Sequence, residues 1–309
     1  MAIDPNAGPL PNFPATVDFP NIRTTSEQDG TFPATASLSF YYAGISSIWI
    51  WYRAPLELLR AYLNPLGMTP YDFGNGEGAV NVNFFNAVAL YGLGQPGNKG
   101  VGGFNETELN IVGCASAVTL NVPQGLTLEQ YLLTGDPTKR VGNYRVWVAC
   151  DDAIAVAAGR AVFMENKFLM DYEYNVPGAN FARPEPKQFT WDWIASWRPA
   201  PTEPAQTIYS AVVALDGLSP VLGNASEIID LSFDTASRRP VGSRRNYLGL
   251  FDTYLQPAVA NAVTLSAGDS EHPMVHDISQ LIGDAKPVAL QVYRSPTCIA
   301  EAAGYYADL

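Results

Sequence analysis

Lys167 is the residue whose surroundings point most clearly to chemistry. It lies within residues 161–170 (AVFMENKFLM), where most side chains are apolar, whereas the other four lysines lie in loop sequence rich in Gly, Pro and Asp. Loss of hydration disfavours a charged ammonium group and lowers its pKa. A neutral amine is a nucleophile that forms a Schiff base with a carbonyl compound. The ordinary alternative is that Lys167 lays its methylene groups on apolar surface and keeps its charge in water.

Glu106 and Glu108 form a second candidate group. They lie two residues apart at the entrance to an expected strand, so their side chains point to the same face. Two carboxylates on one face can titrate at different pH values and act as acid and base. The ordinary interpretation is a polar strand entrance.

Two other motifs lack the context that their chemistry needs. Residues 92–97 (GLGQPG) match a dinucleotide-binding fingerprint, but the following NKGVGG cannot begin a helix, so we expect a flexible loop. His272 and His276 have the spacing of zinc ligands on a helix, but Pro273 lies between them and a third ligand is not evident. We expect a surface loop there.

Four arginines lie close together in residues 237–245 (SRRPVGSRR). They are Arg238, Arg239, Arg244 and Arg245. We favour a solvated hairpin tip or a subunit contact for this segment. The functional alternative is a forked clamp on an anionic substrate.

The expected elements are many strands and few helices. Strands are expected at residues 45–52, 79–91, 108–117, 144–149, 189–193, 207–215, 228–233 and 288–293, and helices at 55–63, 127–133 and from 153–158 into Lys167. This composition favours an α+β, mainly antiparallel fold, as a sheet or barrel with helices on one side. We expect residues 1–35 to form an extended arm and residues 36–309 a single domain.

Composition excludes several classes of protein. With 309 residues, 47% of them hydrophobic and 16% charged, the chain is globular. A net charge of −12 argues against binding to nucleic acid or anionic membranes, and no apolar stretch is long enough to span a bilayer. Three cysteines do not suit a disulfide framework, and residues 1–19 lack the pattern of a secretory signal. We expect a cytoplasmic protein.

Four stretches, taken in order, resemble the acetoacetate decarboxylase family. They are Tyr52-Arg53 before the helix at 56–63, Phe104-Asn105-Glu106 before a strand, Gly159-Arg160 followed by Lys167, and Leu250-Phe251-Asp252. The resemblance implies a β-barrel or cone with a few peripheral helices. It also implies a homo-oligomer.

The resemblance assigns roles to two residues and shows three departures. Lys167 matches the family's Schiff-base nucleophile, and Glu106 matches an active-site glutamate. A second lysine of the family is replaced by Phe168, a second glutamate by Asn83, and an arginine by Ile45. With Phe168 in place, desolvation is the expected route to an activated Lys167.

The implied function is a Schiff-base lyase acting on a keto acid or related carbonyl compound. It would decarboxylate a β-keto acid, or carry out aldol and dehydration chemistry through the imine of Lys167, with Glu106 moving protons. We expect neither cofactor nor metal. The residues expected around the substrate are Asn83, Tyr52, Phe163, Phe168 and Arg160.

Two alternatives stay open from the sequence. The first is a catalytically altered barrel that binds a small apolar carbonyl metabolite. The second is an enzyme that uses Glu106 and Glu108 as acid and base without an imine.

Overall fold

In the computed structural model of the chain, the described residues are 40–90, 101–177, 190–224, 227–246, 250–295, 299–301 and 305–308. The expected arm at residues 1–35, the loop at residues 92–97 and Cys298 lie outside them. The single domain expected for residues 36–309 stays a prediction.

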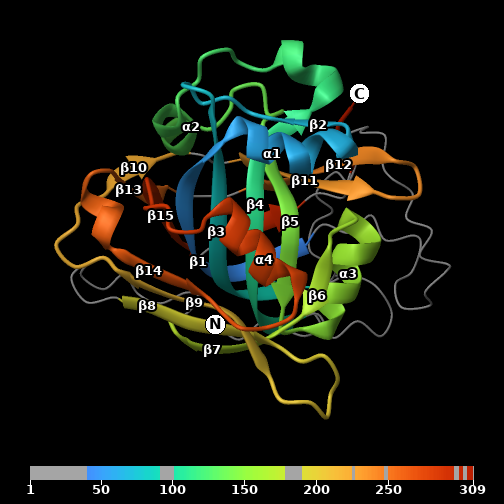
Figure 1. Cartoon of the computed structure of the whole chain (residues 1–309), viewed down its shortest axis with the longest axis vertical. Coiled ribbons are helices and arrows are strands. Elements are labelled where there is room, and N and C mark those ends of the chain that lie inside the picture. The colour runs from blue at the N-terminus through green and yellow to red at the C-terminus, as the bar shows by residue number, and fades with distance from the viewer. Residues whose placement is uncertain are drawn as a thin grey trace, which may run out of the picture.

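Most strands belong to one large sheet at the centre of the molecule (Figure 1). Within the described residues it has thirteen strands. They are β1 (Phe40–Pro55), β2 (Met68–Pro70), β3 (Glu77–Leu90), β4 (Val101–Ala115), β5 (Gly142–Cys150), β6 (Lys167–Leu169), β10 (Val221–Gly223), β11 (Glu227–Asp234), β12 (Arg239–Asn246), β13 (Phe251–Leu255), β15 (Ala289–Ser295), β16 (Ile299–Glu301) and β17 (Tyr305–Tyr306). A smaller sheet contains β7 (Asp171–Asn175), β8 (Thr190–Trp197), β9 (Gln206–Ala214) and β14 (Val263–Ala267).

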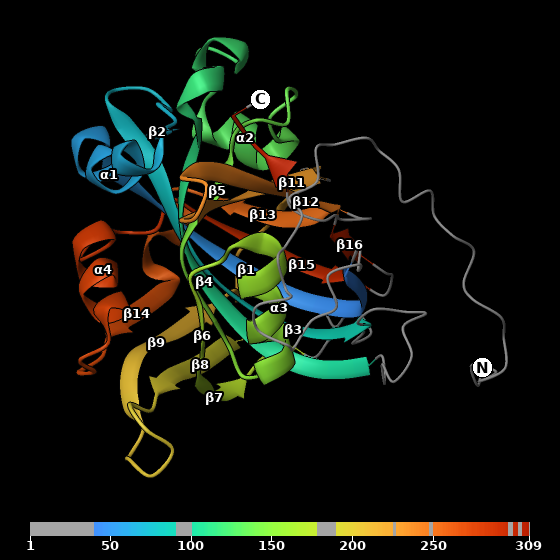
Figure 2. The same ribbon diagram turned by 90° about the vertical axis from the view of Figure 1, so that its right-hand side faces the viewer.

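The large sheet curves round a central interior (Figure 2). Its longest ladders are antiparallel and join β1 to β3, β3 to β4, and β4 to β5. β5 then pairs with β11 in parallel, and β11 forms a hairpin with β12. Ladders of only two and three residue pairs link β12 to β16 and β16 to β1, so the sheet is less than a fully hydrogen-bonded barrel. The expected α+β, mainly antiparallel fold is confirmed.

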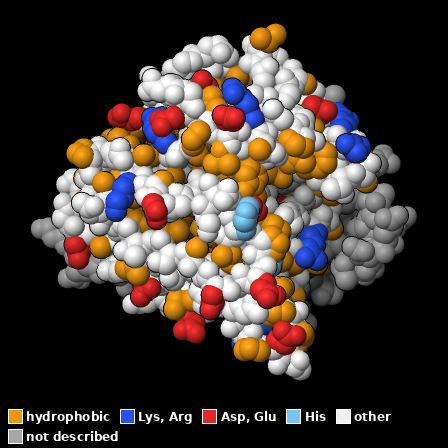
Figure 3. Space-filling view, viewed as in Figure 1, with side chains coloured by type: hydrophobic (Ala, Val, Ile, Leu, Met, Phe, Trp, Pro, Cys, Tyr) orange, Lys and Arg blue, Asp and Glu red, His pale blue; other side chains and the backbone are white. Residues whose placement is uncertain are grey.

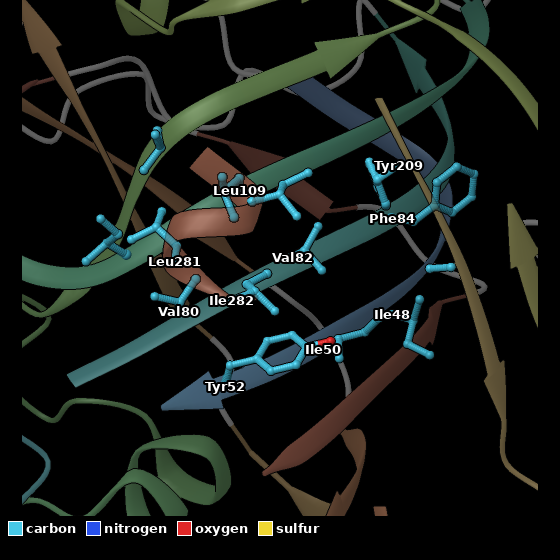
Figure 4. Packing of buried hydrophobic residues seen from close by; sticks show 14 of the residues in the cluster. Ile48, Ile50, Tyr52, Val80, Val82, Phe84, Leu109, Tyr209, Leu281 and Ile282 are labelled. Carbon is cyan, nitrogen blue, oxygen red and sulfur yellow. The ribbon is translucent and has the colours of Figure 1, made fainter. Parts of the chain in front are cut away.

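Alternation along the strands divides the core into two layers. Successive side chains of a strand point to opposite faces. Trp49 and Phe85 therefore face the interior of the curved sheet, whereas Ile48 and Phe84 face outward. Figure 4 shows Ile48 and Phe84 in the outer layer with Tyr209 of the small sheet. A polar side chain on the face of Phe85 consequently lies inside the curved sheet.

The described helices lie at the periphery of the large sheet (Figure 1). They are α1 (Leu56–Leu63), α2 (Leu128–Thr134), α3 (Ala153–Phe163) and α4 (Pro273–Leu281), with 3-10 turns at Asn64–Leu66, Ser116–Asn121 and Ala258–Asn261. None of the helices in the described ranges is long and apolar enough to cross a membrane.

Local capping explains where these helices begin. α1 starts after Pro55, and Thr127 forms a capping box with Gln130 at the start of α2, so both predicted helices are confirmed. His272 caps α4 and Pro273 occupies its first turn. The surface loop expected around these histidines is therefore wrong.

Helix α3 ends before Lys167. Asp152 caps its start, and Met164 adopts a left-handed conformation (φ 55°) at its end. The chain then enters β6, whose first residue is Lys167. The expectation that the helix runs into Lys167 is wrong, because the left-handed residue stops it one turn earlier.

Candidate active site

Local structure around α3 explains how Lys167 enters the interior. Gly159 lies against the lysine stem, and a Cβ atom at this position would overlap the Cδ of Lys167 and a carboxylate oxygen of Glu165. Arg160 donates from Nε to the backbone carbonyl of Lys167 at 2.6 Å. These two residues of α3 therefore have different functions. Gly159 leaves space for the Lys167 side chain, and Arg160 fixes the Lys167 backbone by a hydrogen bond.

Lys167 and Glu106 are in direct contact. The Nζ of Lys167 lies 2.5 Å from Oε2 of Glu106 and 3.3 Å from Oε2 of Glu165. The side chains of Lys167 and Glu106 are 7% and 4% exposed, so the ion pair is buried. The structure thus brings together the lysine and glutamate that the sequence singles out.

Burial does not lower the pKa of Lys167 as the sequence leads us to expect. Burial is the largest single influence and disfavours the charged amine, but Glu106 and Cys150 together outweigh it and raise the pKa of Lys167 above its ordinary value. Burial also raises the pKa of Glu106, and Lys167 offsets this only in part. The raised pKa of Lys167 favours its ammonium form, and the raised pKa of Glu106 suits this group to accept a proton.

Arg145 of β5 connects this pair to further buried charges. Its guanidinium group forms ion pairs with Glu165 and Asp230, and its Nε lies 3.4 Å from Glu108. Arg245 of β12 lies 3.2 Å from both Glu108 and Asp230. Burial of charge is tolerated because each group has opposite charges beside it.

Glu108 is held in its ionised form. Burial would raise its pKa, but the guanidinium groups of Arg145 and Arg245 and amide hydrogen bonds lower it to about 2. Asn83 donates to Glu108 at 2.6 Å and Asn110 at 3.0 Å. Glu106 and Glu108 therefore share a face, as expected for this strand, and their pKa values shift in opposite directions.

Asn83 and Arg160 are hydrogen-bonded to Glu108 and to the backbone of Lys167, respectively. The side-chain oxygen of Asn83 accepts from the backbone N–H of Glu108 at 2.8 Å while its amide nitrogen donates to the Glu108 carboxylate. Arg160 is exposed and contacts the lysine backbone. Both residues position charged side chains of the site.

Three aromatic residues expected at the substrate lie in different environments. Tyr52 pairs with Val80 on the outward face of β1, opposite to the face of Glu106. Phe168 follows Lys167 and points away from it, with its ring 4.1 Å from that of His272. Phe163, at the end of α3, packs in the interior cluster that contains Phe85. We retain Phe163 as a candidate wall residue and not Tyr52 or Phe168.

Sequence analysis missed Phe85, which lies directly across the strand pair from Glu106. Opposite residues of an antiparallel pair have neighbouring side chains. Phe85 packs 6.0 Å from Phe104, and the Arg245 guanidinium carbon lies 5.6 Å over the Phe85 ring. The pairing of β3 with β4 would have been enough to identify Phe85, because this pairing places it opposite Glu106 and on the same face.

The arginine cluster has two separate environments. Arg238 is exposed in the β11–β12 turn, and Arg239 pairs with Asp308 near the surface. Arg245 is buried inside the sheet with Glu108. The predicted solvated hairpin tip is confirmed for Arg238. Arg245 instead belongs to the interior charge cluster, because the alternation of side chains along β12 places it on the inner face.

A cavity lies away from Lys167, at the α2 end of the interior. Its internal volume is about 20 Å³, room for about one water molecule, and its lining includes Trp51, Tyr131 and Asn143. Asn143 accepts from Asn81, whose side-chain oxygen accepts from Asn110. This link reaches Glu108 through Asn110, whereas Lys167 and Glu106 are not among the lining residues of the cavity. The interior charges are clustered, whereas the charged side chains on the face shown in Figure 3 are scattered over the surface.

Comparison with known proteins identifies the fold. No protein-family model matches the chain, and no curated protein matches it. The enduracididine biosynthesis enzyme MppR complexed with pyruvate superposes with a TM-score of 0.56 at 14% identity, covering 88% of this chain and 91% of MppR. Acetoacetate decarboxylase from Legionella pneumophila superposes with a TM-score of 0.51 at 13% identity, covering 92% and 94%. The chain has the acetoacetate decarboxylase-like fold.

A further solved acetoacetate decarboxylase agrees with this assignment. It superposes with a TM-score of 0.53 at 11% identity and covers 92% of this chain and 97% of that enzyme. The acetoacetate decarboxylase-like fold expected from the four sequence stretches is therefore confirmed. The identities are low, so the similarity concerns the arrangement of the backbone.

Proposed function

We propose that the protein is a Schiff-base lyase that acts on a keto acid or a related carbonyl compound. The observation that carries the proposal is the buried contact of 2.5 Å between the amine of Lys167 and the carboxylate of Glu106. An amine in contact with a proton acceptor of raised pKa is suited to become a nucleophile when a carbonyl compound is bound.

The proposed reaction begins with proton transfer from Lys167 to Glu106. The neutral amine adds to the carbonyl carbon, and Glu106 returns its proton to the departing hydroxyl group, so that loss of water gives an iminium ion beside an ionised Glu106. The electron pair of the bond next to the iminium carbon then moves toward nitrogen, which releases carbon dioxide or an aldehyde and leaves an enamine. Glu106, protonated again by solvent in decarboxylation or by the aldol hydroxyl group in aldol cleavage, donates this proton to the enamine carbon, and hydrolysis frees Lys167.

The substrate class follows from the neighbourhood of the pair. Phe85 and Phe104 provide apolar surface beside Glu106, which favours a carbonyl compound with an apolar or aromatic part. MppR has been solved with pyruvate and with the condensation product of pyruvate and imidazole 4-carboxaldehyde. Decarboxylation of a β-keto acid and aldol chemistry on a pyruvate-type donor are both within this class. We also expect a cytoplasmic homo-oligomer.

Reductive trapping tests the proposal. The protein is incubated with pyruvate, acetoacetate or an aromatic aldehyde, reduced with borohydride, and weighed intact by mass spectrometry. We expect a single adduct that is lost in Lys167→Arg and retained in Lys286→Arg, because Lys286 is exposed. Failure of every carbonyl compound to leave an adduct would refute the proposal.

The raised pKa of Lys167 favours one alternative function. An amine that keeps its proton throughout would make the protein a barrel that binds a small apolar carbonyl metabolite without turnover. Calorimetry would then detect carbonyl binding while borohydride leaves the protein mass unchanged.

The opposite pKa shifts of Glu106 and Glu108 favour a second alternative. These carboxylates would act as acid and base without an imine. In that case Lys167→Ala would retain most of the activity, whereas the lyase proposal requires its loss.

A further inference from the structure

Glu165 is a second carboxylate beside the amine of Lys167. Its Oε1 is paired with the guanidinium group of Arg145, and its Oε2 lies 3.3 Å from the lysine Nζ. The side chain is 2% exposed, and among the described residues Oε2 is buried without a hydrogen-bond partner. An acceptor atom of this kind is costly to bury unless a donor reaches it.

We propose that Glu165 is the fixed counter-ion of the protonated imine on Lys167, which leaves Glu106 free to move protons. This inference rests on the proposed Schiff-base function and deepens it. Glu165 is a positioning residue, because it acts on the reacting carbon only through the lysine nitrogen.

Charge conservation explains why such a residue is needed. An ammonium ion and a carbonyl compound condense to an iminium ion and water, so the nitrogen keeps one positive charge and one N–H. A buried cation is stable only beside an opposite charge. If Glu106 accepts and returns protons during the reaction, it is neutral in some steps. These are the steps in which the lysine nitrogen loses or regains its charge, and a second carboxylate that stays ionised keeps a countercharge beside the nitrogen through all of them.

Arg145 makes Glu165 suited to this role. A guanidinium group does not lose its proton in proteins, and its charge-assisted hydrogen bond stabilises the ionised carboxylate. Glu106, in contrast, is in contact with the amine whose proton it would accept. The two carboxylates thus divide between a permanent charge and a proton carrier, as in other sites where two acids have different neighbours.

The end of α3 fixes the position of Glu165. Its backbone N–H donates to the carbonyl of Gly159 at 3.1 Å, directly after the left-handed residue Met164. The absence of a side chain at Gly159 leaves space for the Glu165 carboxylate against the lysine stem. The carboxylate is therefore held at the amine by both its backbone and its ion pair.

The other charged or titratable groups around this pair come from several elements. They are Glu106 and Glu108 of β4, Arg145 and Cys150 of β5, Arg160 of α3, Asp230 of β11 and Arg245 of β12. Arg145 disfavours a charge on Lys167, whereas Glu106 and Cys150 favour it. A substitution of Glu165 alone therefore removes one of several charges that act on the nitrogen of Lys167.

The test is the pH at which the imine loses its proton. The imine is formed with [2-13C]pyruvate, or with the carbonyl compound that trapping selects, and the carbon-13 chemical shift is followed against pH. We expect Glu165→Gln to lower the deprotonation midpoint by about one pH unit or more. Glu165→Asp keeps the charge and restores the midpoint at least in part, and the exposed control Glu57→Gln leaves it unchanged. An unchanged midpoint in folded Glu165→Gln would overturn the inference.

A second measurement uses the unaltered protein. Its imine should keep the proton to a higher pH than the imine of the same carbonyl compound with N-acetyl-lysine amide in water. A midpoint equal to or below this comparator would overturn the role of Glu165 even if the variants do not fold. Absence of any imine in the unaltered protein would instead refute the proposed function.

Discussion

At the scale of residues, two opposing influences act on the Lys167 amine. Burial disfavours its charge, while Glu106 at 2.5 Å favours it. Glu106 and Cys150 together outweigh burial, so the pKa of the amine lies above its ordinary value and favours the charged form. Reactivity then depends on moving one proton within the pair, and Glu106 is prepared for this because burial raises its pKa.

Glu106→Gln should lower the pKa of Lys167. The substitution removes the carboxylate that raises this pKa, while burial and Arg145, which lower it, stay in place. We expect a fall of about one unit or more. The measurement is the pH dependence of Lys167 labelling by an amine reagent, with exposed Glu173→Gln as control. A midpoint that stays constant or rises would contradict the account of the pair.

Gly159→Ala should strongly reduce imine formation. The new methyl group would meet the Lys167 stem and the Glu165 carboxylate and displace both. We expect the trapping rate to fall by about tenfold or more, because small misplacements of reacting groups are costly. Gly103→Ala is the matched control, since a Cβ atom there has only one neighbour, at 4.0 Å. Equal rates for both variants would show that clearance at Gly159 is not required.

Sequence analysis found Lys167 and Glu106 through their apolar context and their spacing, but it missed Glu165 and Arg145. A glutamate two residues before a lysine does not by itself predict a function. The position of Glu165 depends on its ion pair with Arg145 of β5. Such a contact is decided by strand pairing over long separations, which local patterns do not contain.

At the scale of elements, caps and alternation predicted the first helices and the long central strands, but not α4 or strands such as β12, β13 and β14. The Leu56–Leu63 and Leu128–Thr134 helices and the long central strands were expected within a few residues. The prediction for the helix before Lys167 was too long, because apolar residues continue past Met164, where the left-handed backbone ends the helix. Strand β4 begins at Val101, before its expected start, because polar Glu106 lies inside the sheet and not before it.

Thr127→Ala should destabilise α2 without affecting the site. Thr127 accepts from the backbone N–H of Gln130 at 3.2 Å and is part of the capping box. Loss of such a cap costs about 1 kcal/mol. Denaturant unfolding should show this loss while trapping at Lys167 is unchanged. A large loss of trapping would mean that α2 is coupled to the site, contrary to the account.

At the scale of the whole molecule, the interior charges link β4, β5, β11 and β12 across the curved sheet. Arg145 bonds Glu165, which lies 20 positions further along the chain, and also Asp230, which lies 85 positions further along it. Among these strands, the ladder between β5 and β11 has only two residue pairs. The ion pair between Arg145 and Asp230 therefore joins two strands that have few backbone hydrogen bonds to each other.

Glu108 should make stability depend on acid pH. Its pKa is depressed to about 2 in the folded chain from an ordinary 4.5, so its contribution is present above pH 4.5 and is lost as pH falls toward 2. The shift corresponds to about 3 kcal/mol. Glu108→Gln should lower the free energy of unfolding at neutral pH by this order and flatten its decline in that window. Stability as high as that of exposed Glu57→Gln would contradict the account.

The most direct test of the central claim is a crystal structure of the protein after reduction with borohydride in the presence of the carbonyl compound selected by trapping. The account predicts continuous density from the Nζ of Lys167 to the substrate carbon, inside the curved sheet, with Glu106 and Glu165 both within hydrogen-bond distance of the nitrogen. Density for the adduct on another lysine, with the Lys167–Glu106 pair intact, would contradict it.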